Sequence, residues 1–152
     1  HILALGVERF LSADGDAVEI LQSIKDAGGI SVAAHPVSTR KREHQTYYLW
    51  DRKGELRHHF DAWEVASGRV LFDEVLKERL PVLANSDLHH PRQMSSWKSK
   101  FDCEKKREAI LQSICEQKLD WVYYEDPTSQ PSSHRGSGAQ WTHAAQPQLA
   151  LN

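Results

Sequence analysis

The sequence predicts an α/β fold, because short apolar runs alternate with segments of helical spacing. The apolar runs read as strands: ILALGV at 2–7, ISVAAHP at 30–36, FDAWEV at 60–65, PVLANSD at 81–87 and DWVYY at 120–124. Nearly continuous apolar character is typical of strands that are buried on both faces. Strands separated by helices indicate βαβ crossovers, and therefore a parallel sheet covered by helices.

Helices are expected between these strands. The first follows the candidate N-caps Asp14 and Asp16, carries apolar residues at helical spacing and ends at Gly28-Gly29. The next is expected at 69–79, RVLFDEVLKER, and the last at 104–117, EKKREAILQSICEQ. Both segments are long enough to connect parallel strands and to cover one face of the sheet.

Length and composition indicate one soluble domain. The chain has 152 residues, with 39% hydrophobic and 26% charged residues and a formal net charge of −2. This charge gives no reason to expect a nucleic-acid or membrane surface, which usually needs a concentrated positive field. No apolar run is long enough to span a bilayer, no leader opens the chain, and its two cysteines suggest no disulfide framework. We therefore expect a cytoplasmic protein.

Two segments interrupt the alternation of strands and helices. Residues 36–60 contain six Lys/Arg against three acids, and they follow a strand end, where α/β folds place functional loops. The segment from Pro127 is rich in Ser, Gln, Pro, Gly and Ala and lacks apolar periodicity, which is typical of disorder. The expected organisation is a folded portion at 1–126 and a disordered tail at 127–152.

Residues with metal-ligand side chains recur where the predicted strands meet loops. His35 closes the second strand, Glu64 lies near the end of the third, Asp87 and His89 close the fourth, and His1 precedes the first. Because parallel strands present their carboxyl ends at one rim, these side chains are expected to lie close together.

Asp87 and His89 are expected to point to the same side, since residues i and i+2 of an extended chain do so. Imidazole and carboxylate together suit Zn, Mn or Fe better than Ca or Mg. Each residue also has a simpler interpretation. An Asp-x-His pair is common at surfaces and caps, His35 could be a capping or core histidine, and His1 could belong to a disordered terminus.

The segments HILALGV, GGISVAAHP, DAWEV and LPVLANSDLHHP occur in that order, with helices between them. Together they resemble the later motifs of the PHP (polymerase and histidinol phosphatase) domain family, over roughly residues 1–125. The resemblance implies a distorted (β/α)7 TIM-like barrel with two or three divalent metals at its carboxyl rim, which usually hydrolyses phosphoesters. Because the chain holds too few βα units to close such a barrel, we expect a partial barrel whose first strands are missing.

The resemblance also implies a role for each candidate residue. His1, His35, Asp87 and His89 match metal ligands of the family, and Glu64 matches a recurring acid that could orient a ligand or simply be solvated at a strand end. Catalysis would use a metal-activated water, with Asp87 and His89 as the catalytic residues. His89 or the adjacent His90 could protonate the leaving oxygen, although one imidazole cannot do this while it ligates a metal.

A phosphorylated small molecule or nucleotide is the expected substrate. Arg40, Arg42 and Arg92 follow the ligand motifs, and a guanidinium can hold a phosphate through two hydrogen bonds. The alternative interpretation of these arginines is a solvated basic loop.

The His-x-His pair that opens the family's motif set, and other upstream ligands, have no counterpart in this chain. The chain is therefore expected to be the carboxyl-terminal portion of a PHP phosphoesterase, completed by an upstream half or by another chain. Two alternatives stay open: a non-catalytic metal- or partner-binding module, and an amidohydrolase-like metal hydrolase.

Overall fold

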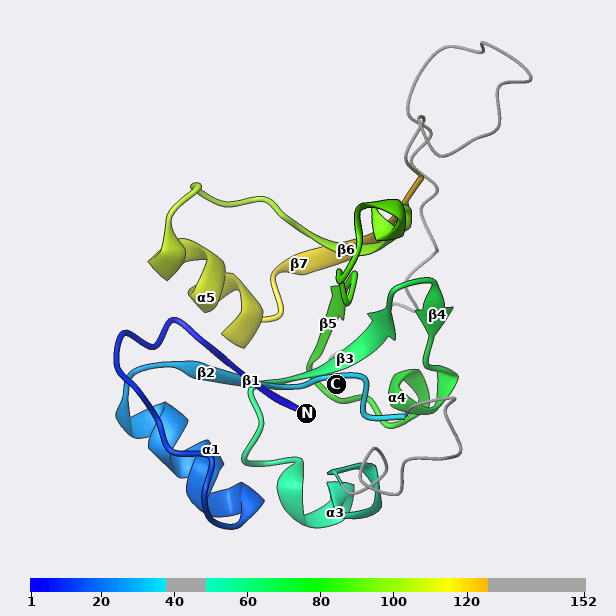
Figure 1. Ribbon diagram of the computed structural model, residues 1–152. Helices are drawn as coiled ribbons and strands as arrows, with labels where there is room; N and C mark the ends of the chain where they lie inside the picture. The colour runs from blue at the N-terminus through cyan, green and yellow to red at the C-terminus, as the bar shows by residue number, and fades with distance from the viewer. Residues whose placement is uncertain (38–48, 126–152) are drawn as a thin grey trace, which may run out of the picture.

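The computed structural model describes residues 1–37 and 49–125 (Figure 1). The elements, in chain order, are β1 (Ile2–Leu5), α1 (Ala17–Asp26), β2 (Ile30–Ala33), α3 (Lys53–Leu56), β3 (Ala62–Ser67), β4 (Val70–Leu71), α4 (Asp73–Lys77), β5 (Val82–Asn85), the 3-10 helix η1 (Pro91–Gln93), β6 (Ser96–Phe101), α5 (Arg107–Cys115) and β7 (Leu119–Tyr124). Strands β1 to β5 form a five-stranded sheet, and β6 and β7 form a two-stranded one. The predicted α/β class is therefore confirmed for the described segments.

The centre of the five-stranded sheet is parallel, as predicted. Strand β3 pairs in parallel with β2 on one side and with β5 on the other. The expectation that the whole sheet is parallel is wrong, however, because β1 runs antiparallel to β2, and β4 antiparallel to β3. The segment between Leu5 and Ala17 carries the chain back along β1 before α1 begins, so that β2 enters the sheet in the opposite direction (Figure 1).

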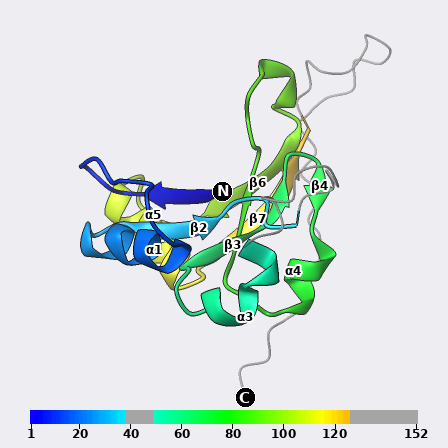
Figure 2. The same ribbon diagram turned by 60° about the horizontal axis from the view of Figure 1, so that its bottom comes forward.

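Helices cover both faces of this sheet. In both views α1, α3 and α4 lie along the same side (Figures 1 and 2), and in Figure 1 α5 lies on the other. Successive strand residues point to opposite faces, which explains the two apolar clusters. Ala33 joins a cluster that contains Leu21 of α1, whereas its neighbour Val32 joins a cluster that contains Ile114 of α5.

Two local predictions need correction. The helix expected at 69–79 is limited to Asp73–Lys77, because Val70 and Leu71 pair with the end of β3 around Gly68, whose φ is +59°. Strand β6 was not predicted at all. Its sequence, SWKSKF, carries few apolar residues, and its pairing with β7 rather than its own pattern makes it a strand.

Parts of the chain lie outside the described residues. The predicted tail at 127–152 and residues 38–48 of the basic segment are among them.

Cys103 and Cys115 are free thiols, in agreement with the sequence. In the described segments, no helix has the length and apolar character needed to cross a membrane.

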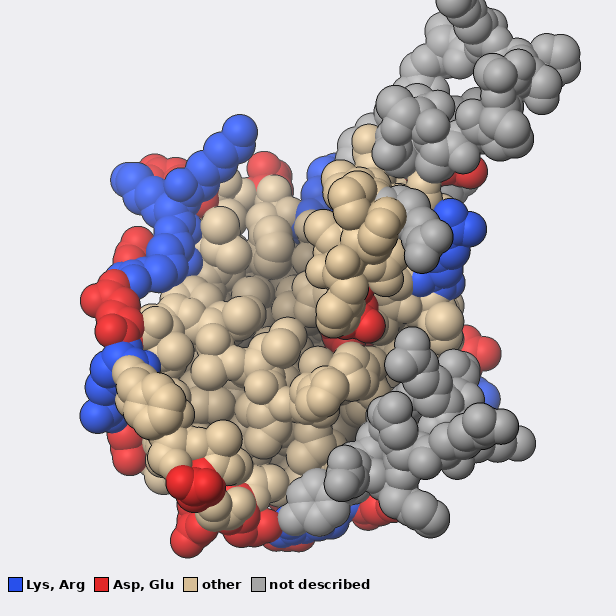
Figure 3. Space-filling model, viewed as in Figure 1, with Lys and Arg blue, Asp and Glu red and all other residues tan. Residues whose placement is uncertain are grey.

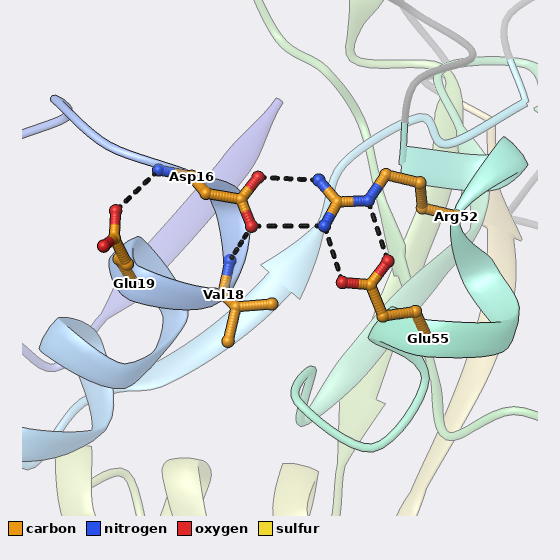
Figure 4. Close-up of polar contacts among 5 residues, drawn as sticks. All are labelled: Asp16, Val18, Glu19, Arg52 and Glu55. Atoms are coloured by element: carbon orange, nitrogen blue, oxygen red, sulfur yellow. Dashed lines mark hydrogen bonds and ion pairs between the residues drawn. The ribbon is translucent and has the colours of Figure 1, made fainter.

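The amino end of α1 is joined to α3 by a polar network (Figure 4). The Asp16 side chain accepts a hydrogen bond from the Val18 amide at 3.5 Å, and the Glu19 carboxylate completes the capping box by accepting a bond from the Asp16 amide at 2.9 Å. Arg52 donates to both carboxylate oxygens of Asp16, at 2.7 and 3.1 Å, and also binds Glu55. These acids raise the pKa of Arg52. The network therefore holds α3 against the start of α1.

Replacing Asp16 by alanine is expected to lower the free energy of unfolding by about 1 kcal/mol, because the helix loses its capping oxygen. Asp16→Asn keeps a capping oxygen at this position but removes the charge that faces Arg52. Because exposed ion pairs contribute little to stability, this variant should lose less free energy of unfolding than the alanine variant does. Urea denaturation of both variants measures the difference. Equal losses in the two variants would show that the charge, and not the cap, sets the stability.

Candidate functional site

The candidate site lies at the edge of the sheet where β2, β3 and β5 end. Because β1 is antiparallel to β2, its first residues lie at this same edge, and Ile2 is paired with Ala33. The Ala34 amide donates to the His1 carbonyl at 3.0 Å, and the Gly68 amide donates to the Asn85 carbonyl at 3.1 Å. The strand ends that carry the predicted residues are thus tied together through their backbones.

His1 and His35 face each other across this edge. The Nδ1 atom of His1 lies 2.9 Å from Nε2 of His35, and the two rings are nearly perpendicular, at 84°. At this distance one nitrogen carries a proton and the other accepts it. Once that proton is released, both nitrogens have a lone pair that they can offer to one cation.

His35 and Asp87 have strained backbones. Their φ angles are +33° and +48°, in the left-handed region that residues other than glycine seldom adopt. Each lies two positions beyond the last residue of a strand, His35 after β2 and Asp87 after β5. Strain of this kind concentrates at functional sites, where surrounding contacts hold it in place. The sequence could not show it, because neither residue is one that the left-handed region demands.

Glu64 is the buried carboxylate of the site. It is only 2% exposed, and one of its oxygens accepts a hydrogen bond from the His35 amide. Burial raises the pKa of Glu64; bonds from His35, Asn85 and Ser67 oppose that rise, and the nearby charge of Asp87 adds to it. The register of β3 against β5 shifts between Glu64 and Ala66, and local irregularities of this kind re-aim side chains beside active sites.

The raised pKa of Glu64 predicts how the stability of the protein depends on pH. Because the folded protein holds the Glu64 proton more tightly than the unfolded chain does, the free energy of unfolding falls as the pH rises from about 4.5 through the folded-state pKa. Glu64→Gln removes this ionisation. We expect the variant to be more stable than the wild type at neutral pH and to lose this advantage below the ordinary pKa of glutamate.

Urea denaturation across this pH range, with a chelator present, checks the expectation. Glu104→Gln, in which the replaced side chain is 70% exposed, is the control for the substitution itself. A Glu64→Gln variant that is less stable than the wild type at neutral pH would contradict the reasoning.

Asp87 and His89 come close together, but not as the sequence suggested. Strand β5 ends at Asn85, so the pair lies in a turn and not in extended chain, and the expected reason for their proximity is wrong. The Nδ1 atom of His89 lies 2.8 Å from the Asp87 carbonyl oxygen and 3.5 Å from its Oδ1 atom. Since a carbonyl only accepts, Nδ1 carries a proton, and in the neutral form of the ring Nε2 then keeps its lone pair. The side chains of His89 and Asp87 are 77% and 45% exposed.

The structure brings the predicted residues together in two pairs, His1 with His35 and Asp87 with His89. Within 1–37 and 49–125, no three His, Cys, Asp or Glu side chains are placed to hold one metal ion together. Glu64 is linked to both pairs: it accepts a hydrogen bond from the His35 amide, and the charge of Asp87 helps to raise the pKa of Glu64. The metal-ligand and catalytic roles of these residues stay predictions.

The predicted phosphate-binding arginines cannot be placed. Arg40 and Arg42 lie outside the described residues, and so does the side chain of Arg92. In the view of Figure 3, the described Lys and Arg side chains lie around the outline of a face whose middle is largely uncharged.

Sequence reasoning missed two polar residues of the site, Asn85 and Ser67. Both side chains hydrogen-bond to the Glu64 carboxylate. Asn85 is the last residue of β5 and Ser67 the last of β3. A polar residue that ends an otherwise apolar strand was the available signal, and it was visible in the stretch PVLANSD.

Comparison with known proteins finds a likeness in structure. No family model matches the sequence, and no curated protein matches it. A solved structure of a two-domain protein from Bacteroides vulgatus, which contains a predicted PHP-like metal-dependent phosphoesterase, is similar to this chain with a TM-score of 0.60 and 16% sequence identity. The match covers 81% of this chain and 40% of the other, so that the chain spans well under half of that protein. At this identity the likeness establishes the fold alone.

Proposed function

We propose that this chain carries part of the active site of a divalent-metal-dependent phosphoesterase of the PHP type. In this proposal His1, His35, Asp87 and His89 are metal ligands, and Glu64 orients His35. The metal is Zn, Mn or Fe, and the substrate is a phosphorylated small molecule or nucleotide. For the complete domain, of which this chain would be a part, the proposal includes a closed barrel and a centre of two or three metal ions.

The observation that carries the proposal is the contact between His1 and His35. Two imidazole nitrogens from residues 34 positions apart in sequence lie 2.9 Å apart, at a sheet edge that also holds a buried carboxylate. The fold likeness to a protein that contains a predicted metal-dependent phosphoesterase adds support.

The donor set fits a divalent transition metal in part. Neutral imidazole nitrogens and a carboxylate are ligands that such ions prefer, and the free Nε2 of His89 is of this kind. A bound divalent ion would acidify a water molecule and offset the charge of the phosphoryl oxygens. The described side chains supply pairs of donors and not a group of three, so part of the coordination must come from elsewhere.

The residues of the chain itself have two tasks in this scheme. Glu64 holds the His35 backbone and, through it, the direction of the imidazole ring. The bond from His89 Nδ1 to the Asp87 carbonyl fixes the tautomer of that ring, so that Nε2 can bind a cation or exchange a proton with the leaving oxygen, but not both at once.

Hydrolysis of p-nitrophenyl phosphate and of small nucleotides tests the proposal. The wild type is expected to show activity that EDTA removes and Zn²⁺ or Mn²⁺ restores. Asp87→Asn should lower kcat/KM by about 100-fold, and asparagine is chosen because it tolerates the positive φ of this position.

The other outcomes of these measurements would each favour a different function. Metal binding without hydrolysis would assign the chain to a non-catalytic binding module, and hydrolysis of amides in preference to phosphoesters would favour an amidohydrolase-like enzyme. A wild type that neither binds metal nor hydrolyses a phosphoester would contradict the proposal.

A further inference from the structure

The side chain of Gln93 closes the turn that carries Asp87 and His89. Its Oε1 atom accepts a hydrogen bond from the His89 amide at 2.8 Å, and its Nε2 atom donates to the Asp87 carbonyl at 3.3 Å. The same carbonyl lies 2.8 Å from the His89 ring nitrogen. One amide side chain thus binds both ends of the Asp87–Leu88–His89 turn.

Hydrogen bonds, and not apolar packing, hold this turn. Leu88 at its centre is 51% exposed, and Met94 further along the loop is 39% exposed. Asp87 has a φ of +48°, a conformation that persists only where surrounding contacts over-determine it. Gln93 supplies two of the contacts that do so.

Gln93 is itself fixed to the fold. It ends the 3-10 helix η1, and its amide donates to the His90 carbonyl at 2.8 Å. Its carbonyl accepts a bond from the Ser96 hydroxyl at 3.0 Å, and Ser96 is fully buried at the start of β6. From β6 the Lys98 ammonium group reaches back to the Met94 carbonyl at 3.1 Å. These hydrogen bonds therefore hold in place the backbone that carries the Gln93 side chain.

We propose that Gln93 is a positioning residue, which sets the direction of the Asp87 carboxylate and the His89 imidazole for binding a divalent cation. The inference rests on the function proposed above. An amide side chain suits the task because it offers one acceptor to the His89 N–H and one donor to the Asp87 carbonyl, and it adds no charge that would compete for the ion.

The test uses Gln93→Met, which keeps the length of the side chain but removes the hydrogen-bonding groups. Gln112→Met is the matched control, because Gln112 bonds to Glu116 on the surface of α5. Two measurements are made on the full chain: hydrogen exchange of the His89 amide without metal, by NMR, and the affinity for Zn²⁺, by calorimetry.

We expect Gln93→Met to speed exchange of the His89 amide by about tenfold and to weaken Zn²⁺ binding by about tenfold or more, as loss of a supporting contact does in metal sites. The thermal midpoints of both variants should stay close to that of the wild type. Gln112→Met should leave exchange at His89 and Zn²⁺ affinity unchanged.

The outcomes separate this inference from the proposed function. Unchanged exchange at His89 in Gln93→Met would show that the amide does not hold the turn. Faster exchange with unchanged Zn²⁺ affinity would overturn the positioning role and leave the proposed function in place. A wild type that binds neither Zn²⁺ nor, in the same titration, Mn²⁺ or Fe²⁺ would remove the proposed function and the positioning role with it. The exchange result would then still report whether Gln93 holds the turn.

Discussion

Replacing His35 by asparagine is expected to weaken the binding of Zn²⁺ by about 100-fold. The reason is geometric: the His35 ring supplies one of the two nitrogens that meet 2.9 Å apart at the sheet edge. Asparagine is the suitable replacement, because it is among the residues that tolerate the positive φ found here. Loss of a ligand is thereby separated from backbone strain.

Calorimetric titration measures this effect, and His58→Asn is the control, because His58 is an exposed residue that follows α3. The control is expected to bind Zn²⁺ as the wild type does. Equal affinities of the wild type and His35→Asn would contradict the assignment of His35 as a ligand, whatever the behaviour of the other histidines.

The largest loss of stability is expected for Trp63→Ala, at about 3–5 kcal/mol. Trp63 is fully buried near the start of β3, and its ring packs edge-on against Phe60 and Trp50, with centroid distances of 5.0 and 6.1 Å. Truncation leaves a large cavity in the cluster that joins the sheet to the helices on one face. Most small domains have only about 5–15 kcal/mol of stability, so the variant should be close to unfolding.

Trp63→Phe distinguishes the loss of packing from the loss of a polar group. In the described part of the chain, the Nε1 atom of Trp63 is buried without a hydrogen-bond partner. Phenylalanine removes this unsatisfied donor and keeps much of the aromatic contact, so it should cost clearly less than alanine. Guanidinium denaturation compares the two, and a cost for phenylalanine equal to that for alanine would contradict the reasoning.

The parts of the fold that follow from local pattern could be predicted from the sequence. Apolar runs located β2, β3 and β5, and the capping residues located the start of α1 at Asp16. The direction of β1 could not be predicted, because it depends on the path of the chain between Leu5 and Ala17. Strand β6 could not either, since the pairing partner that defines it lies beyond α5.

The candidate site shows the same division. The strand-end positions of His35 and Asp87 follow from where the apolar runs stop. The meeting of His1 with His35 depends on the antiparallel pairing of β1, for which the sequence has no signal. The register shift beside Glu64 depends on how β3 and β5 are aligned, and so do the bonds that the Glu64 carboxylate receives from Asn85 and Ser67. Such features arise from register, which a single sequence does not determine.

The central claim is that imidazoles from β1, β2 and the loop after β5 serve one metal-binding edge. Long-range proton–nitrogen NMR spectra of the histidine rings, recorded during a titration with Zn²⁺, test it most directly. The ring nitrogens of His1, His35 and His89 are expected to shift together and to saturate together, while His58 and His59 keep their positions. Saturation of His1 and His35 with no change at His89, or shifts spread evenly over all the histidines, would contradict the claim.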